Sequence, residues 1–212
     1  MSKPGEPAEG PEIEIASAVV LAVAGLLTAF VGFQADLYDG EQASKYAQFN
    51  AMRMQASRMQ LQADQLQSLD VNLFSQWLDA KAGRDERLAD FYRTRFPANL
   101  QPPFESWLAL NPLRDEAAPR SPFVMPNYRR DDGSAAQMQI EADKTFKAGE
   151  VANQISDDFN RGNVLLALAM FLAGITQVFH VRTLRIGLVG LAGLACIVGI
   201  FRVLTLPIQW PA

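Results

Sequence analysis

The sequence predicts an all-α membrane protein with three transmembrane helices, and with a long-helix stalk and a proline-rich cap inserted between spans 1 and 2. Three uncharged apolar segments indicate this fold class: residues 15–33, 164–179 and 186–201. The first has 19 residues, and at ~1.5 Å per residue it is roughly 28 Å long, close to the ~30 Å hydrocarbon core of a bilayer. Between the first two segments the apolar residues keep a helical period, and seven of the 12 prolines lie within 97–132.

The composition restricts the classes of function. The chain has 212 residues and a formal net charge of -4, so it has no overall basic field of the kind that attracts nucleic acid. Its single cysteine, Cys196, falls inside the third apolar segment. This excludes intramolecular disulfides and thiol metal sites.

Residues 1–14 are rich in proline, glycine and glutamate, and we expect a disordered tail. The first transmembrane helix, 15–33, carries small residues on one face, at Ala18, Ala22, Gly25, Ala29 and Gly32. Small residues let helices approach closely in lipid, where apolar side chains gain little by leaving the bilayer. We therefore predict that this face packs against other helices, although alanine and glycine are also common in such helices without that role.

The water-facing domain is predicted over 34–160 and begins with helices over 34–96. A heptad-like row, apolar except at one aspartate, predicts a long amphipathic helix. The row consists of Phe49, Met52, Ala56, Met59, Ala63, Leu66, Asp70, Leu73 and Trp77. We expect a bend at Asp39 and Gly40, since glycine costs about 1 kcal/mol of helix propensity relative to alanine. Gly83 should end this helix, and a further short helix is expected over 84–96.

The segment 97–132 is predicted to form a proline-rich cap with only short helical turns, such as 104–110, because proline removes a backbone donor and restricts the preceding residue. It is too apolar for disorder. We expect its large side chains, with the residue just before it, to pack across the helices. These are Phe96, Phe104, Trp107, Leu108, Leu113, Phe123, Met125 and Tyr128.

A returning helix is predicted over 133–160, with an N-cap within Asp132, Gly133 and Ser134. Its expected buried positions are Met138, Ala142, Phe146, Ala152, Ile155 and Phe159. It should run antiparallel to the stalk helix and continue into the second span, 161–181. A tight turn then leads to the third span, 185–206, and a tail over 207–212.

The third span has a small residue at every third position: Gly187, Gly190, Gly193, Cys196 and Gly199. Such a ridge spirals around the helix and can touch two neighbours. The short segments on the N-terminal side carry Lys3, Arg182 and Arg185, against Arg202 on the other side. The positive-inside rule therefore predicts a cytoplasmic N-terminus and an extracytoplasmic domain.

Acidic residues gather on either side of the predicted domain where it meets the spans: Asp36, Asp39, Glu41, Asp157 and Asp158. Around the axis of an oligomer they would form the acidic ring of a cation pore. The simpler interpretation is a solvated helix surface, because the first two apolar segments, 15–33 and 164–179, carry no charged residue to line a hydrated path. The only histidine, His180, lies at a span boundary without an acidic neighbour in sequence, which favours a role as an interfacial residue.

We expect no catalytic, cofactor-binding or metal-binding residues. Paired-carboxylate hydrolysis, nucleophilic catalysis and zinc chemistry each lack a necessary residue, since there is one histidine and the cysteine is within a span. No glycine-rich phosphate loop is present either. The protein is therefore expected not to be an enzyme.

Several motifs resemble an uncharacterised family of bacterial three-span integral membrane proteins. The motifs are Arg95-Phe96-Pro97, Phe104-Glu105-Ser106-Trp107-Leu108-Ala109, the SPFxMPxY-type stretch within Pro119 to Tyr128, and Gly149 to Gln154 leading into Phe171-Leu172-Ala173-Gly174-Ile175. The resemblance implies a bacterial plasma (inner) membrane, with one span, a helical domain and a two-span hairpin. It supplies no catalytic residue.

These observations predict a non-enzymatic, homo-oligomeric membrane scaffold that presents its helical domain for protein contacts, with a coiled-coil-like stalk. The expected partners are the lipid bilayer, further copies of the chain and another membrane protein, without nucleic acid. Two alternatives remain open: an oligomeric cation-conducting pore, and an accessory subunit of a larger membrane complex.

Overall fold

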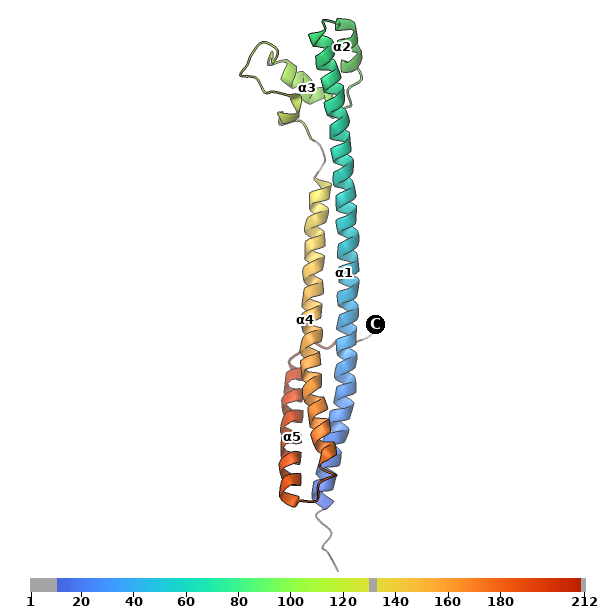
Figure 1. The fold of residues 1–212 in the computed structure, drawn as a ribbon, viewed down its shortest axis with the longest axis vertical. Helices are drawn as coiled ribbons and strands as arrows, with labels where there is room; N and C mark the ends of the chain where they lie inside the picture. The colour runs from blue at the N-terminus through green and yellow to red at the C-terminus, as the bar shows by residue number, and fades with distance from the viewer. Residues whose placement is uncertain (1–10, 130–132, 211–212) are drawn as a thin grey trace, which may run out of the picture. The chain divides into compact units, whose positions relative to one another are not determined.

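The computed structural model describes residues 11–129 and 133–210, and these residues form helices and connections without a strand. The helices are α1 (Pro11–Ala82), α2 (Glu86–Arg93), α3 (Gln101–Leu108), the short 3₁₀ helix η1 (Pro122–Val124), α4 (Ser134–Ile175) and α5 (Arg182–Leu204) (Figure 1). The chain divides into two compact units. The three-helix unit comprises residues 1–48 and 144–212, and the head unit comprises residues 49–143. The predicted all-helical class is confirmed.

In the three-helix unit, each helix buries one face with a seven-residue repeat. On α1 the buried positions include Ser17, Ala24, Val31 and Tyr38. On α4 they include Ala152, Phe159, Leu166 and Ala173, and on α5 Ala192, Cys196, Gly199 and Val203. A seven-residue repeat keeps one stripe of a helix facing its neighbour over many turns. Most of these buried residues are small.

Helices α1 and α4 run antiparallel in this unit, as expected. A Cβ at Gly25 would lie 3.5 Å from Met170 Sδ, and one at Gly32 would lie 3.7 Å from Asn163 Nδ2. Further along, the ring of Tyr38 stacks on Phe159 with centroids 5.9 Å apart, and Tyr46 stacks on Phe146 at 5.3 Å. Along these contacts the residue numbers rise on α1 and fall on α4, as antiparallel helices require.

Helices α4 and α5 approach most closely at two glycines. A Cβ added to Gly162 would lie 2.9 Å from Val203 Cγ2, and one added to Gly199 would lie 3.0 Å from Leu166 Cδ2. Real Cβ atoms rarely come so near, so a larger residue would force the helices apart. Close packing of this kind replaces the hydrophobic effect as the main attraction between helices in lipid.

Large apolar side chains lie on the outside of the three-helix unit. Exposed examples are Leu26, Val164, Phe171, Ile197, Phe201 and Leu204. By length and composition, α1 and α5 are able to cross a bilayer, and only 17% and 22% of their most apolar 18-residue stretches are buried. Helix α4 is not among the helices that are able to cross a bilayer by these measures, and it ends at Ile175 and not at the predicted 181. The second predicted span, 161–181, is therefore not confirmed, and the number of spans that the structure supports is two.

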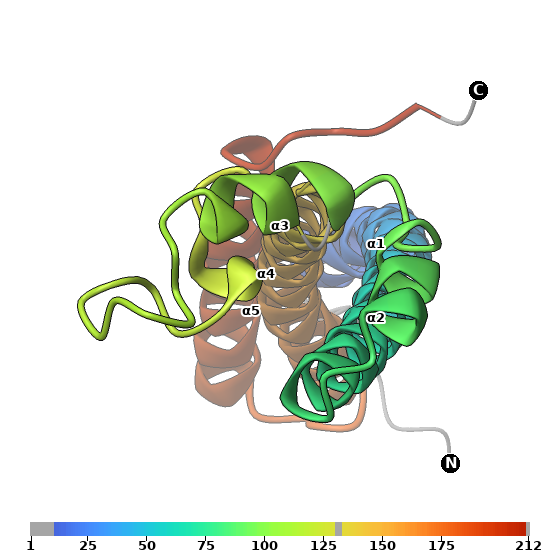
Figure 2. The ribbon, with the colours of Figure 1, turned by 90° about the horizontal axis from the view of Figure 1, so that it is seen from above.

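The head unit is built around aromatic rings. Its core comprises Phe74, Trp77, Ala80, Ala89, Phe96, Leu100, Phe104 and Trp107. Most rings meet edge to face, as in Trp77 with Phe104, whose centroids are 4.9 Å apart at 83°. Figure 2, which looks along the helices, shows α2 and α3 of this unit. The predicted packing of the proline-rich segment is confirmed for Phe96, Phe104, Trp107, Leu108, Phe123, Met125 and Tyr128. Leu113 was predicted to pack, but it is 55% exposed.

Asp70, the polar interruption of the heptad row, is buried and holds the proline-rich segment to α1 within the head. Its Oδ2 atom accepts hydrogen bonds from Asn99 Nδ2 at 2.6 Å and from the Tyr128 hydroxyl at 3.1 Å. Ala56, Ala63 and Trp77 of the same row are also buried, whereas Leu66 is exposed. A buried carboxylate is tolerated where hydrogen bonds compensate for the lost hydration.

Several predicted boundaries are corrected. Residues 11–14, assigned to a disordered tail, are helical, while residues 1–10 lie outside the described part. The predicted bend at Asp39 and Gly40 is wrong, because α1 continues through both, and the ~1 kcal/mol cost of one glycine is too small to break a long packed helix. The short helix expected over 84–96 is α2, whose first turn is capped by Asp85 accepting from the Leu88 amide.

Two further helices begin near their predicted starts. The turn expected at 104–110 is α3, which starts earlier because Pro102 sits in its first turn, where a missing N–H costs nothing. The predicted N-cap residue Asp132 lies outside the described residues, and α4 begins at Ser134.

The contact at Gly162 predicts a position-specific loss of stability. Gly162→Leu should lower the free energy of unfolding by about 1–3 kcal/mol or more, because the added side chain would overlap Val203. Gly174→Leu on the same helix is the matched control, since nothing lies within 4 Å of a Cβ there. Thermal unfolding of the detergent-solubilised protein, followed by circular dichroism, measures both. Equal midpoints for the two variants would contradict the close α4–α5 packing.

Candidate functional site

Two polar contacts connect α1 to α5 and to the segment after it, one near each end of the apolar stretch of α1. The first, here called the Arg185 clasp, joins Arg185 Nη2 to Glu14 Oε1 at 3.3 Å. The arginine side chain is only 9% exposed, whereas the glutamate is largely exposed. Ser17 lies on the next turn and donates its hydroxyl to the Glu14 carbonyl at 3.0 Å.

The Arg185 clasp offsets an unfavourable position. Arg185 lies in the first turn of α5, where the positive end of the helix dipole repels a cation. Glu14 lies in the first turn of α1, where the same dipole favours a carboxylate. The carboxylate of Glu14 therefore offsets the unfavourable interaction between the Arg185 guanidinium and the dipole of α5.

The second contact, the Gln34 clasp, binds the chain after α5. The side-chain amide of Gln34 donates to the Gln209 carbonyl at 2.9 Å and accepts from the Gln209 amide at 2.9 Å. The Tyr38 hydroxyl donates to the Pro207 carbonyl at 3.0 Å, and Gln209 Nε2 donates to Glu41 Oε2 at 2.6 Å. Gln34, Tyr38 and Glu41 occupy successive turns of α1, so one face of the helix holds Pro207 and Gln209 of the chain after α5.

The electrostatic environment of the Gln34 clasp favours the neutral phenol. Burial, opposed by the hydrogen bond with Gln209 and reinforced by the Glu41 carboxylate, raises the pKa of Tyr38 above its ordinary value. The tyrosine therefore stays protonated at physiological pH and can donate to Pro207.

The spacing of the two clasps matches a bilayer. Glu14 and Gln34 are 20 residues apart on α1, which at ~1.5 Å per residue is roughly 30 Å, the thickness of the hydrocarbon core. No charged residue occurs between them, and none occurs between Arg185 and Arg202 on α5. Polar contacts thus lie at the two ends of an uncharged stretch whose length matches a hydrocarbon core.

The predicted acidic group does not form one cluster. Asp36 and Asp39 are exposed on α1, and Glu41 is half-buried in the Gln34 clasp. On α4, Asp158 pairs with Arg161 at 2.7 Å, and Asp157 accepts from Asn153 at 3.4 Å. Two of the five carboxylates therefore bind residues of their own helix, and Glu41 holds the C-terminal segment.

The predicted small-residue faces divide between contacts inside the chain and open surface. Gly25 and Gly32 contact α4, whereas Ala18, Ala22 and Ala29 are exposed. On α5, Cys196 is buried and Gly199 contacts α4, whereas nothing lies within 4 Å of a Cβ built on Gly187, Gly190 or Gly193. The open positions carry no contact within this chain, and their role between subunits stays a prediction.

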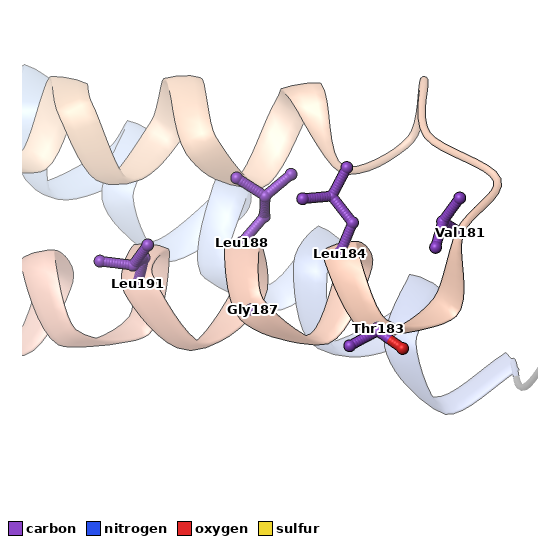
Figure 3. Close-up of a pocket in the computed structure, with 6 residues that line it drawn as sticks. All are labelled: Val181, Thr183, Leu184, Gly187, Leu188 and Leu191. Atoms are coloured by element: carbon purple, nitrogen blue, oxygen red, sulfur yellow. The ribbon is translucent and has the colours of Figure 1, made fainter.

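An open apolar groove of about 420 Å³ lies at the start of α5. It is lined by Val181, Thr183, Leu184, Gly187, Leu188 and Leu191. Figure 3 shows the side chains of Leu184, Leu188 and Leu191 along the start of α5, with Gly187 next to Leu188 and Val181 just before the helix. The groove contains no charged residue, which suits an apolar neighbour such as a lipid tail or a helix.

Chemical groups for catalysis or metal binding do not converge in the described part of the chain. His180 is exposed. The described residues contain no group of three or more histidine, cysteine, aspartate or glutamate side chains that could hold a metal ion. No protein-family description, curated protein or solved structure matches this chain. The candidate site is the pair formed by the Arg185 clasp and the Gln34 clasp. The sequence analysis did not predict either contact.

The Arg185 clasp predicts different effects for two neighbouring carboxylates. Glu14→Gln should lower the thermal midpoint, because the buried Arg185 loses its anionic partner. Glu12→Gln changes an exposed position in the same first turn and removes the same helix-dipole interaction, but it leaves the pair of Glu14 and Arg185 intact. It should therefore lower the midpoint less. Circular dichroism of the detergent-solubilised variants measures both midpoints. A shift at Glu12 equal to or larger than that at Glu14 would contradict the clasp.

Proposed function

We propose that this protein is a non-enzymatic integral membrane protein with three spans that forms homo-oligomers and presents its head unit for contacts with other proteins. The observation that carries this proposal is the pair of clasps. They stand one bilayer thickness apart on α1, with uncharged helix surface and large exposed side chains between them. Such a surface is costly in water and favourable in lipid.

The inverted distribution of side chains supports insertion into lipid. In a water-soluble bundle the large apolar residues fill the core. Here the interior contains many small residues, such as Ser17, Ala24, Ala169, Ala173 and Ala192, beside the larger Tyr38, Phe159 and Leu166. Leu26, Phe171 and Phe201 face outward. The low buried share of α1 and α5 argues against core helices of a soluble protein.

Helix α4 is proposed as the second of the three spans. It packs against α1 through Met170 and Asn163, and against α5 through Gly162 and Leu166. Its uncharged run 162–175 continues beyond the helix end through Val178, Phe179 and Val181, which are exposed. A helix that contacts both candidate spans belongs at the same depth as they do.

The head unit has the features of an interaction module. It has its own aromatic core, and its proline-rich segment leaves Leu110, Leu113 and Val124 exposed. Apolar side chains on a water-facing domain favour contact with another protein. The proposed location is a bacterial inner membrane, with the hairpin arginines Arg182 and Arg185 and the N-terminus on the cytoplasmic side and the head outside.

Cysteine labelling tests the spans and their orientation. In a Cys196→Ser background, Ser75→Cys places an exposed thiol in the head and Thr183→Cys places one in the first turn of α5, next to the connection from α4. With three spans, an impermeant maleimide should label only the Ser75→Cys protein in spheroplasts and should label both after lysis. Labelling of both in spheroplasts would contradict α4 as a span, and labelling of Thr183→Cys alone would reverse the orientation.

Disulfide cross-linking tests self-association. If the open glycine row of α5 faces another copy, Gly190→Cys in the Cys196→Ser background should form covalent dimers in membranes under mild oxidation. Leu191→Cys is the matched control, because the neighbouring residue is equally exposed but lies about 100° around the helix. Monomer at both positions would contradict the proposed packing face, and stronger cross-linking at Leu191 would assign the contact to a different face.

A further inference from the structure

The chain after α5 is bound to α1 at some residues and exposed at others. From Leu206 to Trp210 it forms a segment, here called the C-terminal strap, that follows the end of α5. Pro207 and Gln209 are bound to α1 by the Gln34 clasp. Ile208 and Trp210, the alternate residues, are exposed, with Ile208 at 43% and Trp210 at 81%. The strap is therefore bound to α1 at Pro207 and Gln209, while the apolar side chains of Ile208 and Trp210 remain exposed.

Exposed apolar side chains also lie close to the strap in sequence and next to its binding residue on α1. Phe201 and Leu204 at the end of α5 are exposed, and so is Phe33, which precedes Gln34 on α1. Arg202, also exposed, lies between the two α5 residues. Side chains of this kind, with a tryptophan and an arginine at the end of an apolar helix, are typical of the level where hydrocarbon meets headgroups.

We propose that the C-terminal strap is a membrane-interface anchor whose depth is set by the Gln34 clasp, with Ile208 and Trp210 inserted among lipid headgroups. This inference rests on the proposed membrane insertion. The partner of these exposed side chains is the lipid bilayer, because Phe201 and Leu204 of the proposed lipid-facing surface closely precede the strap and Phe33 precedes Gln34. Tryptophan suits that position, since its ring is apolar and its indole N–H finds polar partners.

The hydrogen bonds of the clasp meet a requirement that lipid imposes. Backbone groups near the hydrocarbon region need partners, because water is scarce there. Gln34 supplies both for Gln209, one to its N–H and one to its C=O, and Tyr38 supplies the partner of the Pro207 carbonyl. The strap is thereby ordered before it meets the membrane, and Trp210 loses less freedom on insertion.

Tryptophan fluorescence in lipid vesicles tests this assignment on the full chain. Trp77 and Trp107 are buried in the head core, so Trp210 is the exposed tryptophan. In vesicles that contain lipids brominated near the headgroups, part of the emission should be quenched, and this quenching should be lost in Trp210→Phe. Gln34→Ala should reduce lipid quenching and increase quenching by aqueous acrylamide. Gln48→Ala, an exposed position on α1 outside the clasp, should behave as the unmodified chain.

A carbonate wash of the same vesicles separates the two proposals. Protein that stays in the pellet, with Trp210 emission unaffected by brominated lipid and quenched by acrylamide, would overturn the anchor while insertion stands. Trp210 emission protected from both quenchers would assign the strap face to a protein neighbour and also overturn the anchor. Protein released by the wash would overturn the membrane insertion and the anchor together. Lipid quenching that is unchanged in Gln34→Ala would remove the depth-setting role of the clasp.

Discussion

The three-helix unit depends on close contact between helices that keep their large side chains on the outside. Large apolar side chains face outward, and small residues make up much of the interior beside Tyr38, Phe159 and Leu166. Helices α4 and α5 pack closely at Gly162 and Gly199, where an added Cβ would meet Val203 and Leu166. The polar clasps at Glu14 and Gln34 fix the register further, because each joins one residue of α1 to one residue of α5 or of the chain after it.

The head unit is stabilised in a different way, by a core of large side chains. Its helices α2 and α3 are short, with eight residues each, and isolated helices of that length are unstable in water. They are held by aromatic rings that fill the core and by the buried Asp70, which collects Asn99 and Tyr128 on one carboxylate oxygen. One chain therefore combines a unit with large apolar side chains on its surface and a unit with aromatic rings in its core. The first arrangement suits lipid and the second suits water.

The proposed function follows from this division. A unit with an apolar exterior and clasps one bilayer thickness apart is suited to anchor, and a unit with its own aromatic core is suited to present a surface. The strap is consistent with the same division, since Gln34 and Tyr38 hold the chain after α5 on α1 and Trp210 remains exposed.

Local patterns in the sequence were enough to predict the helical class, the apolar segments and the packing of Phe104 and Trp107, because periodicity and composition act over a few turns. In the heptad row they predicted the burial of Ala56, Ala63 and Trp77 but not the exposure of Leu66. They did not predict that α1 continues through Gly40, where the cooperativity of a long helix outweighs one glycine. The clasps were decided only by the tertiary structure. Gln34 and Gln209 are 175 positions apart, and no local pattern records a hydrogen bond that exists only once α1, α4 and α5 have packed.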